Sequence, residues 1–319
     1  MSRTPLLDQI RATEVEKKKG APSILKPLVN EWLAENPDSD GKWTETDFEV
    51  LKDLIVRGAT RDHKVFSPSG ATRCTRLQII DKHPEFKPTP LTDVKSISIF
   101  MDGNWRHLKW QMVFHKMGIA ESFEIFKKLG DLDYGGSYDV VVWLNMKKLG
   151  GNKLEKKMKV IVDIKGANDH AYHEVRKTRK AKKAHWVQVQ IYMMLHGIQF
   201  AILWYENKNT QDITEIVVEA DPEFWKKVQR RSKRMRHFVN LGGFPAEECD
   251  VEGRGYEFQQ CPQRKACLRL PVHVIENGQL RKVSEPRVRS RKPKYAQWNS
   301  LPLRRLKNHQ RVREKPLKK

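Results

Sequence analysis

The sequence is poor in cysteine and in acidic residues. Its 319 residues include 4 cysteines, and 39 Asp and Glu residues stand against 61 Lys and Arg residues. Residues 1–20 contain no continuous apolar core of the kind that a secretory signal needs, so we expect a cytoplasmic protein. In a reducing compartment, so few cysteines are expected to be free thiols or metal ligands rather than disulfides.

The sequence also lacks a long apolar run. Its most apolar stretch, residues 186–205, is interrupted by polar side chains that a lipid-facing helix would tolerate poorly: Gln188, Gln190, His196 and Gln199. We therefore predict no membrane segment. The Walker A pattern G-x-x-x-x-G-K-[ST] is missing as well, so any helicase activity would have to come from a separate partner protein.

Basic residues outnumber acidic residues in the chain as a whole, and the excess is greatest after residue 280. The formal net charge is +22, of which +13 lies in residues 281–319, where 15 Lys and Arg residues stand against Glu285 and Glu314. Such an excess favours a polyanionic partner because each neutralised phosphate releases condensed counterions, whereas solubility alone is the alternative explanation. Residues 281–319 have too few apolar groups to offset their ordering entropy and are predicted to be a disordered tail.

The apolar pattern divides the rest of the chain into two predicted regions. Residues 1–66 form a helical region, and residues 67–280 form the main domain. Helices are expected over Glu45–Val56 and over 93–118. A further helix ending near Gly197 carries Gln188 and Tyr192, which are four residues apart and therefore share one face.

Two β-rich runs, 139–144 and 159–165, flank a polar segment centred on Gly150 and Gly151 and predict a β-hairpin. A turn symmetric about Gly151 pairs residues whose numbers sum to 302, which places Asp139 opposite Asp163. Lys165 follows Asp163 by two residues, so the strand period puts all three side chains on one face.

Two carboxylates and a lysine on adjacent strands suit phosphodiester hydrolysis. The carboxylates can hold hard divalent cations, and the ammonium group can stabilise charge that develops on the phosphate. Without further context, Asp163-Ile164-Lys165 is better explained as an ordinary strand end whose charged side chains are solvated.

Five short motifs resemble those of the RecB-like nucleases in the PD-(D/E)XK superfamily, in particular the CRISPR-associated RecB-like exonucleases and related phage exonucleases. They are Ser67-Pro-Ser-Gly-Ala-Thr-Arg-Cys74, Gly103-x-x-x-His107, Gly136-x-x-Asp139, Asp163-x-Lys165 and Gln188-x-x-x-Tyr192. The resemblance implies an α/β fold with a restriction-endonuclease-like core, in which a central mixed sheet is flanked by helices.

The resemblance also implies roles for individual residues. Asp139, Asp163 and Lys165 would be catalytic, with Gln188 and Tyr192 contributing from their helix. Mg²⁺ or Mn²⁺ would be bound by His107, the two aspartates and the main-chain carbonyl of Ile164. His185 could face the same groove, but it is interpreted as a helix-surface residue.

The implied activity is that of a metal-dependent DNA exonuclease acting on single strands or duplex ends in recombination, repair or phage DNA processing, in a bacterial or phage-infected cell. A separate helicase or recombination protein would be its partner. The alternatives are a structure-selective endonuclease on the same core and a non-catalytic nucleic-acid-binding protein. A basic run beside the catalytic helix is expected to contact the DNA backbone, although it could be a solvated face: Arg176, Lys177, Arg179, Lys180, Lys182 and Lys183.

The cysteines are distributed one near the N-terminal side and three near the C-terminal side of the main domain: Cys74, Cys249, Cys261 and Cys267. This distribution is similar to that of family members in which a [4Fe-4S] cluster joins the chain ends around the nuclease core. Cys249 departs from the pattern because it precedes Cys261 by twelve residues instead of forming a C-x-x-C pair. Four-thiolate zinc is the second interpretation, and unconnected buried cysteines are the third.

Overall fold

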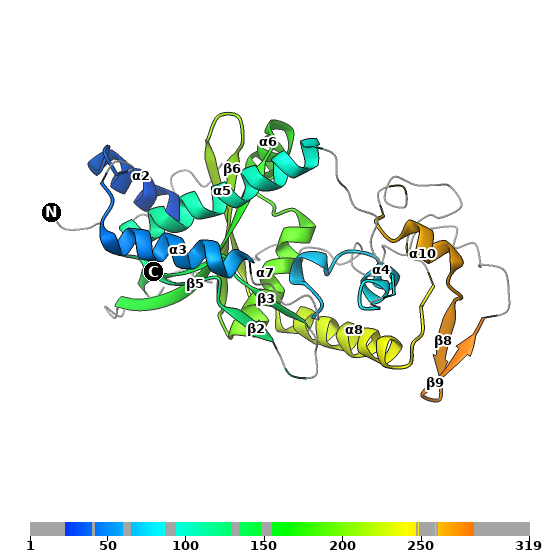
Figure 1. Cartoon of the computed structure of the whole chain (residues 1–319). Helices are drawn as coiled ribbons and strands as arrows, with labels where there is room; N and C mark the ends of the chain where they lie inside the picture. The colour runs from blue at the N-terminus through cyan, green and yellow to red at the C-terminus, as the bar shows by residue number, and fades with distance from the viewer. Residues whose placement is uncertain are drawn as a thin grey trace, which may run out of the picture.

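A computed structural model describes most of the chain (Figure 1). The described residues are 23–39, 42–59, 65–83, 85–86, 94–128, 130, 134–147, 155–246, 248, 259 and 261–283. The predicted disordered tail beyond residue 283, the first 22 residues and Cys249 lie outside them. Within these ranges, no helix combines the length and the apolarity that crossing a membrane requires.

A five-stranded mixed sheet forms the centre of the structure. Its strand order is β1-β4-β5-β6-β7, in which only the β5–β6 pair is parallel. The strands are β1 (Ala120–Phe123), β4 (Val140–Lys147), β5 (Glu155–Ala167), β6 (Phe200–Asn207) and β7 (Ile213–Glu219). The predicted α/β fold with a central mixed sheet is confirmed.

Helices cover both faces of this sheet (Figure 1). Apolar residues of α2 (Leu25–Glu35) and α5 (Val94–Lys116) pack on one face, against Val140, Val162 and Trp204. On the other face, α6 (Asp169–Thr178) and α7 (Lys183–His196) pack against Ile161 and Leu203. Successive strand residues therefore alternate between the two cores, as a sheet covered on both faces requires.

A third apolar cluster lies on the side of α7 that faces away from the sheet. Val187 and Ile191 of α7 pack there against α8 (Pro222–Asn240) and α4 (Thr75–Ile80), and Cys267 of α10 (Arg264–Arg269) joins them. The smaller elements are α3 (Glu45–Ala59), the 3₁₀ turn η1 (Pro68–Gly70), and the strands β2 (Phe126–Lys128), β3 (Gly135–Ser137), β8 (His273–Glu276) and β9 (Gln279–Lys282). Helix α7 is thus enclosed between the sheet and this outer layer.

The predicted hairpin has the expected register, because Val140 pairs with Val162 and Val141 with Ile161. Both of its strands are longer than expected and end at Lys147 and Ala167. Helices predicted over 45–56 and 93–118 are confirmed as α3 and α5. The Ser-rich segment forms only the short η1 turn, and the α-helix begins after it at Thr75. Strand β9 crosses the predicted domain boundary at residue 280.

The buried side chain of Arg76 ties α4 to the C-terminal segment. Its guanidinium group donates to the carbonyls of Pro245, Leu270 and Cys267 at 2.7, 2.7 and 3.1 Å. Arg76 is fully buried, and it lies over the ring of Phe244. A buried cation with this many acceptors is stabilised in place, so segments almost 200 residues apart in sequence are held together.

The carboxylate of Glu215 caps α2, which has no side-chain cap of its own. Glu215 lies on β7 and is 1% exposed. It accepts hydrogen bonds from the main-chain N–H groups of Ile24, Leu25 and Lys26, the last two at 3.0 and 2.9 Å. The negative charge therefore lies where a helix N-terminus is partially positive.

We predict that Glu215→Ala lowers the free energy of unfolding by about 2–3 kcal/mol, because three N–H groups lose their acceptor. Urea denaturation would measure the change. The matched control is Glu219→Ala, which removes an exposed carboxylate from the end of the same strand and should change stability by less than about 0.5 kcal/mol. Equal losses in the two variants would contradict the capping role.

Candidate active site

Two carboxylates meet at the end of the β4–β5 hairpin. Extending the register by one residue beyond the Val140–Val162 pair brings Asp139 opposite Asp163. Both side chains are buried, Asp139 to 7% exposure and Asp163 completely. Asp139 Oδ2 accepts the main-chain N–H of Ile164 at 2.6 Å. In a strand, the N–H and C=O of one residue point to the same side, so the Ile164 carbonyl also faces Asp139.

Lys165 lies on the same face as the two carboxylates. Its Nζ is 2.7 Å from Asp163 Oδ2, and its side chain is 14% exposed. Both carboxylate oxygens of Asp163 are buried, and Oδ2 is paired with the Lys165 ammonium group, whereas Oδ1 has no hydrogen-bond partner among the described residues. A buried carboxylate normally accepts several hydrogen bonds, so Asp163 has coordination capacity left for a cation.

Helix α5 contributes His107 and Gln111, which are four residues apart and share one helical face. His107 Nδ1 lies 3.4 Å from Asp139 Oδ1. Gln111 Nε2 donates to the Asp139 carbonyl at 2.9 Å and to Glu124 Oε1 at 3.0 Å. Helix α5 therefore contacts both the side chain of Asp139, through His107, and the main-chain carbonyl of Asp139, through Gln111.

Glu124 completes the site, and no motif in the sequence indicated it. It follows β1 in a left-handed conformation with φ 47°, and its Oε2 accepts Ser137 Oγ at 3.0 Å. Its only sequence signal is a single acidic residue within the apolar run from Phe123 to Phe126. Such a residue is more often solvated, and only the bend after β1 turns it toward Asp139.

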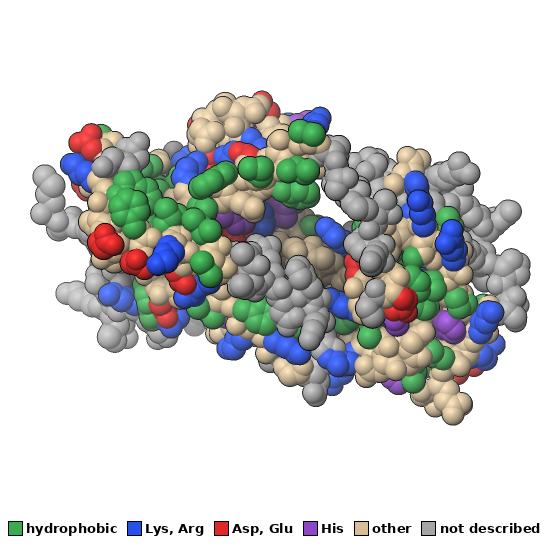
Figure 2. All heavy atoms as spheres, in the orientation of Figure 1, with side chains coloured by type: hydrophobic (Ala, Val, Ile, Leu, Met, Phe, Trp, Pro, Cys, Tyr) green, Lys and Arg blue, Asp and Glu red, His purple; other side chains and the backbone are tan. Residues whose placement is uncertain are grey.

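His107, Glu124 and Asp139 could hold a metal ion. One ligand atom from each of the three lies within 4.8 Å of the others. Among the described residues this is the one set of three acidic, His or Cys side chains with that geometry. An imidazole with carboxylates suits a divalent cation. Asp163 is not a member of this set, so its place among the metal ligands stays a prediction. Figure 2 shows His, acidic and basic side chains gathered in a recess beneath α5.

The charges of this site shift one another's pKa values. Burial raises the pKa of Asp163 to about 6, since Lys165 only partly offsets the effect of burial and of the Asp139 charge. Burial and the Asp139 charge also raise the pKa of Glu124. Burial alone would raise the pKa of Asp139 as well, but His107, Lys165 and the Ile164 N–H outweigh it and lower that pKa. Three crowded carboxyl groups of this kind favour a bound cation.

Gln188 and Tyr192 share one face of α7, as their spacing predicted, and Tyr192 is close enough to Asp163 and Asp139 for their charges to act on it. Gln188 Nε2 donates to Tyr192 Oη at 3.1 Å, and both side chains are buried. Burial and the charges of Asp163 and Asp139 raise the pKa of Tyr192 well above its ordinary value. A side chain at Gly136 would approach Tyr192 to 3.2 Å and Pro68 to 2.9 Å, which explains the glycine in the motif before Asp139.

The interpretation of His185 as a helix-surface residue is wrong. Its Nδ1 lies 2.9 Å from the hydroxyl of Tyr205, and its ring is half-buried. Burial, with the charges of Lys165 and Lys182, lowers its pKa to about 3. The sheet approaches α7 closely enough at its first turn to cover His185, which helical spacing alone does not indicate.

A buried carboxylate anchors α5 over the sheet. Glu206 on β6 is fully buried and accepts from Arg106, Lys109 and Trp110. These residues stand beside His107 on α5, so the same contacts set the position of the imidazole. Gly166, directly after Lys165, leaves room for this arrangement because a Cβ there would lie 3.0 Å from the Arg106 side chain.

The predicted DNA-binding run extends from the last turn of α6 through the α6–α7 connection to the first residue of α7. Four of its members have exposed side chains: Arg176, Lys177, Lys180 and Lys182. Lys183 is half-buried at the start of α7. Arg179 ends α6 in a left-handed conformation and donates to Thr214 Oγ1 at 3.2 Å, so it has a structural role in addition to the predicted one.

Three of the four cysteines are described, and none of the three is in a disulfide bond: Cys74, Cys261 and Cys267. Cys267 Sγ accepts Arg76 Nε at 3.3 Å. These three sulfur atoms do not form a set in which all lie within 4.8 Å of one another. The predicted fourth ligand, Cys249, lies outside the described residues.

No protein-family model matches the chain, and no curated protein sequence matches it. Among solved structures, it is similar to an alkaline exonuclease from Laribacter hongkongensis, with 12% identity, a TM-score of 0.41, and coverage of 56% of this chain and 90% of that one. It is also similar to the protein SSO0001, with 17% identity, a TM-score of 0.40 and coverage of 69% and 93%. A phage related exonuclease from Haemophilus somnus has 18% identity, a TM-score of 0.32 and coverage of 44% and 70%. These likenesses are too distant to assign a role to any residue of this chain.

We predict that Glu124→Gln weakens Mn²⁺ binding about 10-fold or more, because an amide offers the cation no charge. Isothermal titration calorimetry would measure this binding without substrate. Glu121→Gln, at an exposed position of β1 paired with Lys159, is the control and should bind Mn²⁺ like the parent protein. Unchanged affinity in Glu124→Gln would exclude Glu124 as a ligand.

Proposed function

We propose that this protein is a metal-dependent DNA exonuclease that hydrolyses phosphodiester bonds of single strands or duplex ends. The observation that carries the proposal is the buried pair Asp139 and Asp163, with Lys165 on the same face and 2.7 Å from Asp163. Such a grouping is unfavourable unless a cation and an anionic substrate complete it. Recombination, repair and phage DNA processing are the settings in which this activity is used.

His107, Glu124, Asp139 and Asp163, with the Ile164 carbonyl, are the groups that would hold Mg²⁺ or Mn²⁺. Once bound, the cation supplies a water molecule of lowered pKa and neutralises charge on the phosphate. His107 is kept at this place by the contacts of its own helix with Glu206. Gln111 holds Asp139 and Glu124 together, so the ligand set is organised before any ion arrives.

Lys165 has a different task from the carboxylates. Burial would lower its pKa, but Asp163 and Asp139 raise it, so the side chain stays an ammonium cation. A fixed cation in a site closed to water stabilises charge that develops only in the transition state. Asp163 holds the ammonium group in place, and the Tyr192 hydroxyl, bonded to Gln188, closes the same face.

The basic run on the α6–α7 connection would contact the DNA backbone. Arg176, Lys177, Lys180 and Lys182 have exposed side chains, and Lys182 is close enough to influence His185 inside the site. Backbone contacts of this kind position a substrate without reading its sequence. They therefore support a nuclease that acts on DNA of any sequence.

We also propose that Cys74, Cys249, Cys261 and Cys267 hold a [4Fe-4S] cluster, with four-thiolate zinc as the alternative. Arg76 draws α4, which begins directly after Cys74, against α10, which contains Cys267.

Protein purified without oxygen should then be brown, and serine at any one of the four cysteines should remove iron and lower the melting temperature together. Metal analysis and the absorbance spectrum would measure this. Colourless protein with one zinc per chain would contradict the cluster but support metal-linked closure of the chain ends. Colourless protein free of both metals would contradict both.

For the nuclease site, we predict that Asp163→Asn abolishes cleavage of end-labelled linear DNA in Mn²⁺ while DNA binding persists or increases. The substitution removes a metal ligand and a charge that repels phosphate. Lys165→Ala should lower turnover about 100-fold with little change in substrate affinity, since it acts on charge that appears in the transition state.

Asp169→Asn is the matched control, because Asp169 is an exposed carboxylate two residues beyond β5. Its activity should equal that of the parent protein. Cleavage by Asp163→Asn at the parent rate would contradict the nuclease proposal. Cleavage of covalently closed single-stranded circles would replace the exonuclease with a structure-selective endonuclease, and metal-independent binding without turnover would indicate a binding protein.

A further inference from the structure

One face of α8 carries a stripe of polar side chains, none of which belongs to the proposed active site. Lys233, Arg236, His237 and Asn240 follow one another at intervals that place them on a single helical face. The opposite face buries Phe224, Val228, Met235 and Phe238 in the cluster shared with α7. That burial fixes the rotation of the helix, so the stripe is held outward.

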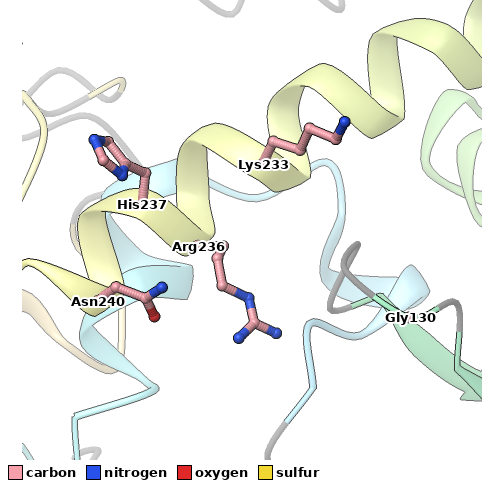
Figure 3. A pocket seen from close by; sticks show the side chains of 5 residues that line it. All are labelled: Gly130, Lys233, Arg236, His237 and Asn240. Atoms are coloured by element: carbon pink, nitrogen blue, oxygen red, sulfur yellow. The ribbon is translucent and has the colours of Figure 1, made fainter. Parts of the chain in front are cut away.

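The stripe lines an open hollow of about 520 Å³ between α8 and Gly130, which lies beyond β2 (Figure 3). Arg236 extends from the helix into this space. The described residues that line it supply N–H donors, and none of them has an aliphatic or acidic side chain. Ligands that bury apolar or aromatic groups need apolar walls, so this hollow suits an anion that is itself strongly hydrated.

The charge of α8 is unbalanced beyond this hollow. Residues 224–246 contain 7 Lys and Arg residues and no Asp or Glu. Like charges three and four residues apart repel each other and destabilise an isolated helix. A bound polyanion would reduce this repulsion. Lys127 and Lys128 are exposed on β2, which lies near α8 (Figure 1). Figure 2 shows Lys and Arg side chains on the part of the surface that β2 and α8 form.

We infer that this face of α8 binds the phosphate backbone of nucleic acid. The inference rests on the proposed function for the identity of the polyanion, because a DNA substrate must extend beyond the bond that is cut. Lys233 and Arg236 offer cations for phosphates, and no Phe, Tyr or Trp among the described lining residues offers a surface for base stacking, so phosphates rather than bases are expected to be bound. The site is therefore predicted to be indifferent to sequence.

The position of α8 fits one continuous strand. Helix α7, which carries Gln188 and Tyr192, lies between α6 and α8 (Figure 1). A strand held on the α6–α7 connection and on α8 would thus pass the carboxylates between two basic surfaces. From residue 233 to residue 240 the helix rises about 10 Å, enough for about three phosphates of one strand.

The test is binding of a 5′-labelled oligo-dT of about 20 nucleotides, followed by fluorescence anisotropy in EDTA over about 50–200 mM KCl. In the variant Lys233→Gln/Arg236→Gln, affinity should fall about 10-fold, and the slope of log K against log salt should lose about 1.4, since each phosphate contact on a single strand contributes about 0.7. Glutamine keeps much of each side chain, and circular dichroism would confirm the fold. The single variant Lys233→Glu, at an exposed position, is a second test that avoids the half-buried Arg236.

The matched control is Lys42→Gln/Lys52→Gln, which removes the same charge from exposed residues next to and within α3. It should bind like the parent protein. An equal loss in this control, or no loss in the α8 variants, would overturn the inference. So would polyglutamate that displaces oligo-dT as effectively as unlabelled oligo-dT, since the site would then be general for polyanions.

The binding assay needs no cleavage, so its outcome is separate from that of the Asp163→Asn experiment. A protein that binds oligo-dT through α8 but cuts nothing would retain this surface and lose the nuclease proposal. If the protein cuts DNA but binds oligo-dT equally well without the α8 cations, the nuclease proposal stands and the α8 surface is contradicted.

Discussion

The mutual burial of Asp139 and Asp163 is the constraint on which the site depends. Antiparallel pairing places them opposite each other, and two carboxylates removed from water repel each other strongly. The immediate surroundings offset this cost through the ammonium group of Lys165, the imidazole of His107 and the N–H of Ile164. Among the described residues, Asp163 Oδ1 nevertheless has no hydrogen-bond partner, so a further cation would complete the offset.

The second level of organisation is the anchoring of α5. His107 can face Asp139 only if the helix lies across the sheet at a defined height, and the buried carboxylate of Glu206 sets that height through Arg106, Lys109 and Trp110. A buried charge is costly without partners, and here three donors serve the one carboxylate of Glu206. Glu206 lies on β6, the strand that pairs with β5, opposite Gly166. The carboxylate that anchors α5 and the active-site residues of β5 are therefore at the same end of the sheet.

The outer layer around α7 connects this edge to the remainder of the chain. Helix α7 presents one side to the sheet, a second to α8 and α4, and Gln188 with Tyr192 to the carboxylates. Arg76 closes the same layer by binding carbonyls of the C-terminal segment. The basic residues of α8 and of the α6–α7 connection therefore stand on elements whose orientation the apolar core has already determined.

The sequence by itself determined what depends on local periodicity. Alternation along the hairpin predicted the pairing of Asp139 with Asp163 and the placement of Lys165, because a strand has a period of two and the turn sets the register. Helical spacing likewise placed Gln188 and Tyr192 together. Only the tertiary structure decided the roles of Glu124, Gln111 and His185. Their contacts join segments whose separation is set by the bend after β1 and by the packing of α5 and α7, and no local period encodes those distances.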